Sequence, residues 1–266
     1  NTVPFIARYR KEATGSLDEV EIREIEERNK YLTNLEKRKE EVLHSIEEQG
    51  ELTEELANEI KQASQMQRVE DLYLPFRKKR RTLATIAKEK GLEPFADWLQ
   101  TFPQGSVEEE AKKYVNAEEE LETVEEVLAG AHEILAETTS DNAEFRTYIR
   151  NFTMNNGKID VQVKDEKADE KGVYQMYYEY EKPLNKMVSH QVLAINRGEK
   201  EGVLSAKVAV DELKIHDYLF YQTVPEMAIS EAIGLVQEAN EDAYKRFIQP
   251  AIEREIRSTL TEEAED

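Results

Sequence analysis

Five consecutive cations in this chain could bind phosphate. The run consists of Arg77, Lys78, Lys79, Arg80 and Arg81, and from residue 77 to residue 90 seven Lys or Arg side chains accompany one Glu. The chain as a whole carries a formal net charge of -21. Guanidinium and ammonium groups in fixed positions form charge-assisted hydrogen bonds with phosphate oxygens. The run is therefore our first candidate for a binding site.

The residues on either side of the cations predict a short, stiff connector. An apolar segment, Leu72–Phe76, comes directly before them. Pro75 fixes its own φ and disfavours helical geometry at the preceding residue, so we expect an incoming helix to end there. Thr82 is a preferred N-cap residue and predicts a new helix from Leu83. We expect the cations to be held between these two elements.

A second interpretation gives the same cations an intramolecular role. Between Ser106 and Glu144 thirteen acids accompany two lysines. The apolar residues of this segment recur at helical spacing, which places the acids on a solvated helix face. The connector cations could pair with these acids and join two parts of the molecule, although each surface pair contributes only about 0–1 kcal/mol. The sequence leaves both interpretations open.

Patterns that would indicate catalysis are incomplete. His132-Glu133 begins a zinc-protease motif, but the position of its second His, 136, holds Ala. Ser189 precedes His190, yet adjacent helical residues point apart, so we expect Ser189 to cap a helix. The twelve tyrosines could stack on bases, but most lie at helical spacing, which favours core positions. We therefore expect no enzyme, no metal and no cofactor.

Composition narrows the class of protein further. A charged fraction of 35% suits long amphipathic helices, and an acidic chain does not predict a general nucleic-acid binder. There is no Cys, which fits a reducing compartment such as the cytoplasm. No apolar run reaches the roughly 20 residues of a membrane helix. Because the sequence opens on Asn1 without a Met, we expect a piece of a longer protein.

Apolar periodicity predicts a mainly α fold, an elongated multi-helix assembly with at most a small β or mixed insert. The first long helix would follow a capping box of Ser16 and Glu19, and a second would follow Thr53. Ala87 and Gly91 resemble the turn of a DNA-binding helix-turn-helix (HTH). Acids at the start of the next helix would repel DNA. We therefore interpret this HTH-like segment, near residues 82–100, as a structural helical hairpin.

The second half of the chain combines two periodicities. Residues 159–163 and 204–210 alternate like strands, whereas Val173, Met176, Tyr177 and Tyr180 repeat like a helix. Thr223 with Glu226 predicts the start of another helix, and Pro250 predicts a kink or a fresh start in the last one. These patterns divide the chain into a helical domain 1–156, a mixed segment 157–222 and a helical connector 223–266.

Several blocks of sequence resemble one family, the Tex transcription accessory proteins of bacteria, which are related to a eukaryotic transcription-elongation factor. The matching blocks are residues 2–12, 45–50, 71–82, 91–94, 189–199 and 253–255. One departure is Val188, where the family commonly has Pro. The resemblance implies an elongated helical scaffold that precedes an RNase H-like domain, helix-hairpin-helix units and an OB-fold RNA-binding domain. It also implies nucleic-acid binding, RNA or DNA, without an established catalytic activity.

Two functional hypotheses follow. In the first, the chain is a non-catalytic scaffold whose connector cations make sequence-independent phosphate contacts, supported by Arg8, Arg10 and Lys11. In the second, it is a protein-interaction platform that docks transcription or translation machinery through acidic helices such as the one carrying Glu108–Glu110. Neither hypothesis involves a membrane.

Overall fold

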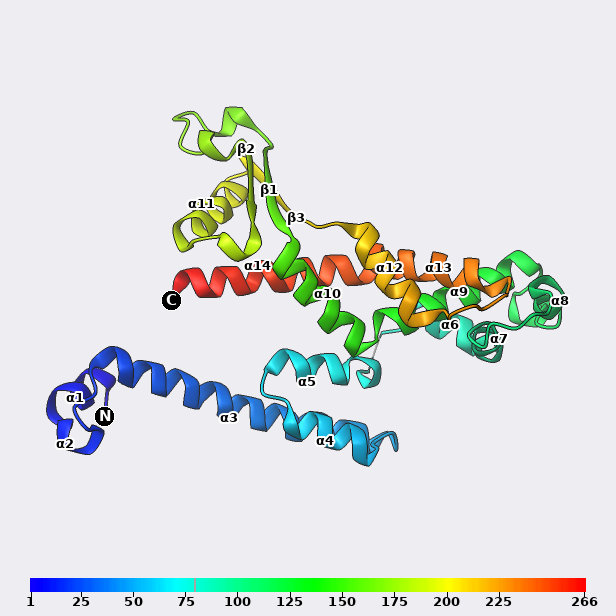
Figure 1. Ribbon diagram of the computed structural model, residues 1–266, viewed down its shortest axis with the longest axis horizontal. Helices are drawn as coiled ribbons and strands as arrows, with labels where there is room; N and C mark the ends of the chain where they lie inside the picture. The colour runs from blue at the N-terminus through cyan, green and yellow to red at the C-terminus, as the bar shows by residue number, and fades with distance from the viewer. Residues whose placement is uncertain (79) are drawn as a thin grey trace. The chain divides into compact units, whose positions relative to one another are not determined.

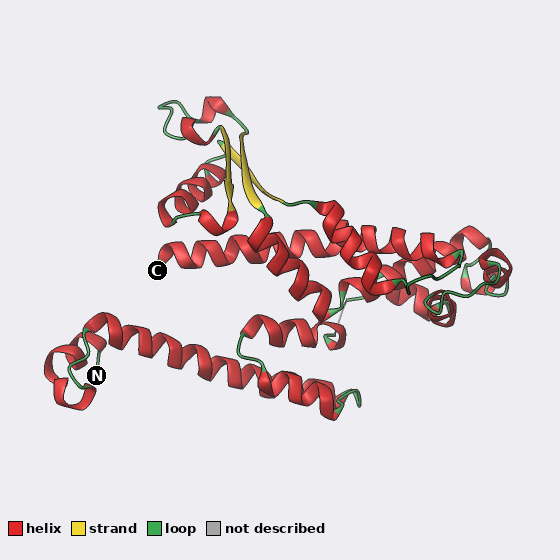
Figure 2. Cartoon of the chain, in the orientation of Figure 1, coloured by secondary structure: helices red, strands yellow, loops and turns green. Residues whose placement is uncertain are grey.

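The computed structural model describes residues 1–78 and 80–266, and it is mainly α with one small antiparallel sheet, as the sequence predicts (Figures 1 and 2). The chain folds into two compact units, Asn1–Arg77 and Lys78–Asp266. The division at residues 156 and 222, which follows composition, stays a prediction. Within the described residues no helix is both long and apolar enough to cross a membrane.

The first unit is entirely helical in its regular structure. Its elements are α1 (Val3–Tyr9), α2 (Lys11–Thr14), α3 (Glu19–Glu48), α4 (Glu54–Gln62), α5 (Met66–Tyr73) and the 3-10 turn η1 (Leu74–Phe76). Thr53 caps α4 as predicted. The capping box predicted at Ser16 is wrong. Ser16 has a φ of 67°, in the left-handed region, and the chain turns before Asp18 and Glu21 form the box that starts α3.

One half of α3 has a buried face in this unit. Leu35, Val42 and Ile46 are buried, and α4 and α5 pack on this part of the helix. Lys39 lies in the same face, where its ammonium donates to the carbonyl of Lys61 at 2.8 Å. The near-heptad pattern also predicts burial of Ile25 and Leu32, and that prediction is wrong. They are 56% and 42% exposed because α4 and α5, which cover Leu35, Val42 and Ile46, do not cover these two side chains.

The second unit has two hydrophobic cores, and the first lies around the long helix α9 (Val124–Ser140). The elements that pack on it are α6 (Leu83–Glu89), α7 (Glu93–Leu99), α8 (Val107–Lys112) and α13 (Ala232–Ala243), and the 3-10 turn η2 (Ala117–Glu119) lies between α8 and α9 in the sequence. The hydroxyls of Thr82, Ser106 and Thr123 cap α6, α8 and α9 as predicted. The HTH-like character of residues 82–100 stays a prediction.

The second core contains the sheet. Its strands β1 (Lys158–Val163), β2 (Glu179–Pro183) and β3 (Leu204–Ala209) lie in the order β2-β1-β3, both pairs antiparallel. The strands predicted at 159–163 and 204–210, and their pairing, are confirmed. The helical repeat predicted through Tyr177 and Tyr180 is wrong. Tyr177 lies in a 3-10 turn and Tyr180 in β2, where strand pairing with Val161 overrides the local pattern.

Helices complete the second core around the sheet, as Figure 2 shows. They are α10 (Ala143–Asn156), α11 (Ser189–Lys200), α12 (Glu212–Thr223), the π-helix η6 (Tyr244–Ile248) and α14 (Gln249–Glu265); the short 3-10 turns are η3 (Glu166–Ala168), η4 (Gln175–Tyr177) and η5 (Leu184–Lys186).

Capping and proline signals predict three helix boundaries in this part, and the structure places the helix ends elsewhere. Ser189 is the first residue of α11 and not its cap, and the side chain of Gln191 accepts from the backbone N–H of Val188 instead. Thr223 is the last residue of α12 and does not start a helix. Its hydroxyl donates to the carbonyl of Leu219, one turn back in the same helix. Pro250 lies in the first turn of α14, where helical backbone continues from the π-helix without a break, so no helix starts afresh there.

Close helix packing generates a stability prediction at Gly130 in α9. A Cβ added there would overlap Cδ1 of the fully buried Leu92, whereas a Cβ on Gly234 in α13 would meet nothing within 4 Å. We expect Gly130→Ala to lower the free energy of unfolding by about 1–3 kcal/mol through overpacking. Gly234→Ala should raise it by about 0.5–1 kcal/mol through helix propensity. Urea unfolding measures both, and equal effects would contradict the packing argument.

Candidate nucleic-acid interface

The connector begins from a cluster built around the ring of Tyr73. The Arg38 guanidinium lies 5.3 Å from the ring centroid and that of Arg77 lies 5.9 Å from it. Both arginines bind the carboxylate of Glu70, Arg38 through Nε at 2.6 Å and Arg77 through Nη2 at 2.7 Å. The hydrogen bond to Glu70 is the main reason that the pKa of Arg38 lies above its ordinary value. The first cation of the run is therefore held in place by its own unit.

The backbone at this point is fixed as well. The 3-10 turn η1, which contains Pro75, ends at the carbonyl of Phe76, and this oxygen accepts a hydrogen bond from Nε2 of Gln49 at 2.8 Å. The Tyr73 hydroxyl and the Ser45 hydroxyl are 2.9 Å apart. Since Gln49 and Ser45 lie at the C-terminal end of α3, the long helix sets the position at which the cation run starts.

The far end of the run is fixed by the cap of α6. Thr82 Oγ1 accepts from the backbone N–H of Thr85 at 3.0 Å and donates to the Glu137 carboxylate of α9 at 2.9 Å. Arg81, just before the cap, pairs with Glu89 of the same helix at 2.8 Å. The last cation is thus close to a carboxylate, although its side chain stays largely exposed.

The middle of the run differs from its ends. Lys78 and Arg80 are exposed, and neither takes part in an ion pair with another described residue. Lys79 lies outside the described residues.

The ion pairs of the run do not favour the intramolecular interpretation. Arg77 and Arg81 pair with Glu70 and Glu89, which both precede the acid-rich segment between Ser106 and Glu144. Beyond the run, Lys90 pairs with Glu120 of that segment at 3.7 Å. The two connector cations that form ion pairs among the described residues therefore use local carboxylates.

The three supporting cations predicted near the N-terminus lie in the first unit. Arg8 belongs to the last turn of α1, Arg10 joins α1 to α2, and Lys11 begins α2. All three side chains are exposed. The structure thus leaves them accessible to a polyanion, and no geometric relation to Lys78 or Arg80 is assigned because these belong to the other unit.

A pocket of about 240 Å³ lies beside the cap of α6, and it does not suit phosphate. Its polar lining includes the carboxylates of Glu133, Glu137 and Asp141, with Arg246 as the cation among the lining residues. Because carboxylates repel a polyanion, phosphate contacts by the connector have to form on its exposed surface.

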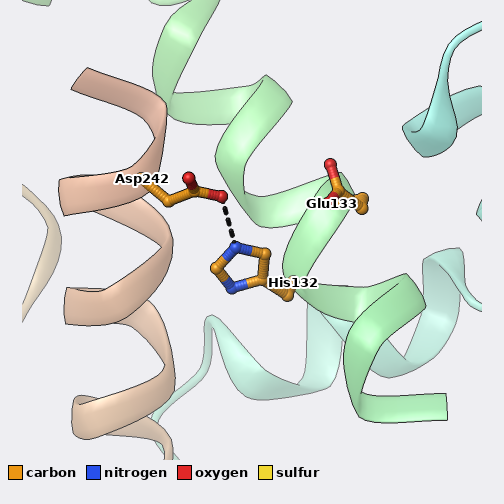
Figure 3. A group of neighbouring side chains, drawn as sticks. All are labelled: His132, Glu133 and Asp242. Atoms are coloured by element: carbon orange, nitrogen blue, oxygen red, sulfur yellow. Dashed lines mark hydrogen bonds and ion pairs between the residues drawn. The ribbon is translucent and has the colours of Figure 1, made fainter. Parts of the chain in front are cut away.

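A second polar group is not predicted from the sequence. His132 and Glu133 of α9 and Asp242 of α13 lie close enough to suggest a metal site, and Figure 3 shows His132 and Asp242 pointing toward each other. His132 Nε2 lies 2.7 Å from Asp242 Oδ2. Arg246 binds both carboxylates, Asp242 at 2.5 Å and Glu133 at 2.9 Å.

The guanidinium of Arg246 supplies the positive charge that a metal ion would otherwise bring. It is the main cause that lowers the pKa of Asp242, with His132 adding to the effect. We therefore interpret the group as an ion-pair network that ties α9 to α13 and η6. The His132-Glu133 pair is visible in the sequence, but its partners lie about 110 residues away and have no local signal.

Comparisons with known proteins confirm the resemblance read from the sequence blocks. A family model described as Tex central region-like matches residues 103–266, and one described as Tex-like protein N-terminal domain matches residues 1–47. Protein YdcI of Bacillus subtilis is 50% identical over 268 residues, which cover 100% of this chain and 37% of that protein. Transcriptional accessory protein Tex of Neisseria gonorrhoeae is 45% identical over 204 residues, covering 77% of this chain and 27% of its own length.

A more distant relative carries an RNA-binding name. S1 RNA-binding domain-containing protein 1 of Homo sapiens is 28% identical over 280 residues, covering 100% of this chain and 28% of that protein. The chain thus spans about a third of the length of the curated relatives it matches.

The Asp242 network generates a prediction on acid stability. The folded pKa of Asp242 is lowered, so its contribution is fully present above the ordinary carboxyl pKa and is lost as pH falls through the folded value. We expect Asp242→Asn to lower the free energy of unfolding by about 1–2 kcal/mol at pH 7. The difference from the unmodified protein should shrink below about pH 4.

Urea unfolding at a series of pH values checks this. Glu19→Gln, which breaks the exposed pair with Arg23, is the matched control and should cost less than about 0.5 kcal/mol. A difference between Asp242→Asn and the unmodified protein that stays constant from pH 7 to pH 3 would rule out the network as its source.

Proposed function

This chain belongs to the Tex family, and on that premise we propose that it is a non-catalytic scaffold of a nucleic-acid-associated transcription accessory protein. In this role the connector makes sequence-independent contacts to the phosphates of RNA or DNA. The names of the relatives, which include a transcriptional accessory protein and an S1 RNA-binding domain-containing protein, support the nucleic-acid association. A role in bacterial transcription also implies the cytoplasm, the compartment that the absence of Cys favours.

The observation that carries the proposal is that two cations of the run form ion pairs with other described residues of the chain and two others do not. Arg77 and Arg81 are paired with Glu70 and Glu89, and the turns on which they lie are fixed. Lys78 and Arg80, between them in the sequence, are exposed and have no carboxylate partner among the described residues. An intramolecular role would be expected to place carboxylates on these two side chains. Their exposure favours a ligand that is not part of this chain.

The acidity of the remaining surface adds to this argument. A net charge of -21 repels a polyanion from most faces of the protein, so a productive encounter has to involve a local positive region. The connector is one such region, and Arg8, Arg10 and Lys11 form another in the first unit. Phosphate contacts of this kind position a nucleic acid without reading its sequence.

A protein-interaction platform remains the second candidate, favoured by the exposed acids between residues 118 and 126. Glu120 forms an ion pair with Lys90, while the other carboxylates of this short segment lie on an exposed surface among the described residues. Capture of transcription or translation machinery that survives nuclease treatment, and is lost when the charges of Glu108–Glu110 are reversed, would favour this role. Capture that nuclease abolishes would speak against it.

The phosphate proposal predicts a change in salt dependence. Each phosphate contact on duplex DNA contributes about 0.9 to the slope of log affinity against log salt. The double variant Lys78→Ala/Arg80→Ala should therefore reduce the magnitude of the slope by about 1.8, with weaker binding at low salt. Fluorescence anisotropy of a labelled duplex between about 20 and 200 mM salt measures it.

Lys112→Ala/Lys113→Ala is the matched control because it removes the same charge from two exposed, adjacent lysines at the end of the acidic helix α8. It should leave the slope nearly unchanged. An equal loss of slope in both double variants would show that the effect comes from net charge and not from contacts by Lys78 and Arg80. An absence of binding at low salt would show that this chain does not bind nucleic acid through the connector.

A further inference from the structure

Helix α1 exposes two aromatic rings on one face. Phe5 and Tyr9 are 39% and 64% exposed, and their ring centroids lie 5.1 Å apart with the planes tilted by 46°. Val3, Ile6 and Ala7 are less exposed, and α1 packs on α3 (Figure 1). Because helical residues three and four apart share a face, Phe5, Arg8 and Tyr9 point outward together.

The rings are surrounded by positive charge. The Arg8 guanidinium lies 6.0 Å from the Tyr9 ring centroid, and exposed Arg10 and Lys11 follow directly. From residue 2 to residue 17 these three cations accompany one acid, Glu12, in a chain of net charge -21. Exposed aromatic rings interleaved with cations are the combination that binds bases and phosphates of an unpaired strand.

The connector lacks well-exposed rings. Tyr73 and Phe76, the aromatic residues that precede the run, are both only partly exposed, and Tyr73 has the guanidiniums of Arg38 and Arg77 at 5.3 and 5.9 Å from its centroid. The connector can therefore recognise charge, which duplexes and single strands share. Helix α1 offers ring faces, which a duplex cannot use because its bases are stacked on one another.

We propose that the outer face of α1, formed by Phe5, Arg8 and Tyr9, stacks on the bases of single-stranded nucleic acid while Arg10 and Lys11 contact its phosphates. This inference rests on the proposed function, since it requires that the chain binds nucleic acid. It adds the form of the ligand and a site in the first unit. Ring stacking is common to all bases, so the site takes RNA and DNA strands alike.

The test compares Tyr9→Leu with the unmodified 266-residue chain on three labelled probes of equal length: oligouridylate, oligothymidylate and a blunt DNA duplex. Loss of one stacked base corresponds to about a 5- to 150-fold loss of affinity. We expect a loss of at least about fivefold on both single strands, with duplex affinity unchanged within about twofold. The salt slope should not change, because no charge is removed.

Two further variants make the result specific. Phe5→Leu should show the same selectivity for single strands, and unchanged thermal unfolding of both variants would show that they fold. Tyr221→Leu is the matched control, since Tyr221 is 77% exposed but lies on α12 in the second unit. It should leave all three affinities unchanged.

The outcomes separate the two proposals. One outcome is that duplex binding has a salt slope that depends on Lys78 and Arg80, while Tyr9→Leu leaves single-strand affinity unchanged. That result would contradict the stacking site and support the phosphate contacts. An equal loss on single strands and duplex, a loss on RNA alone, or the same loss in Tyr221→Leu would also overturn the stacking site. If no probe binds at low salt, both proposals fall.

Discussion

The interaction on which the first unit's part of the candidate interface depends is the binding of Arg77 by Glu70. Its carboxylate accepts from Nε and Nη2 of Arg38 and from Nη2 of Arg77, while both guanidiniums lie against the ring of Tyr73. Planar guanidiniums suit this arrangement because they bind a carboxylate side-on and stack on a ring at the same time. In the second unit, Thr82 fixes the backbone that follows the run through its cap of α6 and its hydrogen bond to Glu137.

Some carboxylates of the acidic surface are balanced by cations close to them, and these carboxylates do not occupy Lys78 or Arg80. Lys112 and Lys113 pair with Glu109 and Glu110 one turn away. Arg246 balances Asp242 and Glu133 across two helices. Exposed pairs within one helix, such as those of Lys112 and Lys113, add little stability, but they satisfy the carboxylates with cations of the same helix. A chain with a large excess of acid can thus keep Lys78 and Arg80 free of carboxylates among the described residues.

The sequence predicts those features that depend on neighbouring residues. Thr53, Thr82 and Thr123 cap helices because the cap bond spans three residues, and β1 and β3 follow from alternation within each strand. It does not predict β2, whose identity depends on pairing with Val161, or the partners of His132, which come from a distant helix. The cation run is visible because its members are consecutive. Which of them are paired depends on Glu70 and Glu89, and the Arg38 that shares Glu70 comes from a distant part of α3 and has no local signal.

Fixed ends have a thermodynamic consequence for the proposed phosphate contacts. Immobilising a long side chain on binding costs about 0.5–1.5 kcal/mol, and ordering the backbone of a flexible loop adds about 1–2 kcal/mol for each residue. Arg77, next to η1, and Arg81, next to the α6 cap, lie on backbone that their own units hold in place, so these two positions avoid most of the backbone cost. Glu70 and Thr82 would then strengthen phosphate binding without touching a phosphate. The same reasoning applies to α1, where packing on α3 fixes the backbone that carries Phe5 and Tyr9. In both places the helical scaffold would contribute to the proposed binding by holding a few exposed side chains in position.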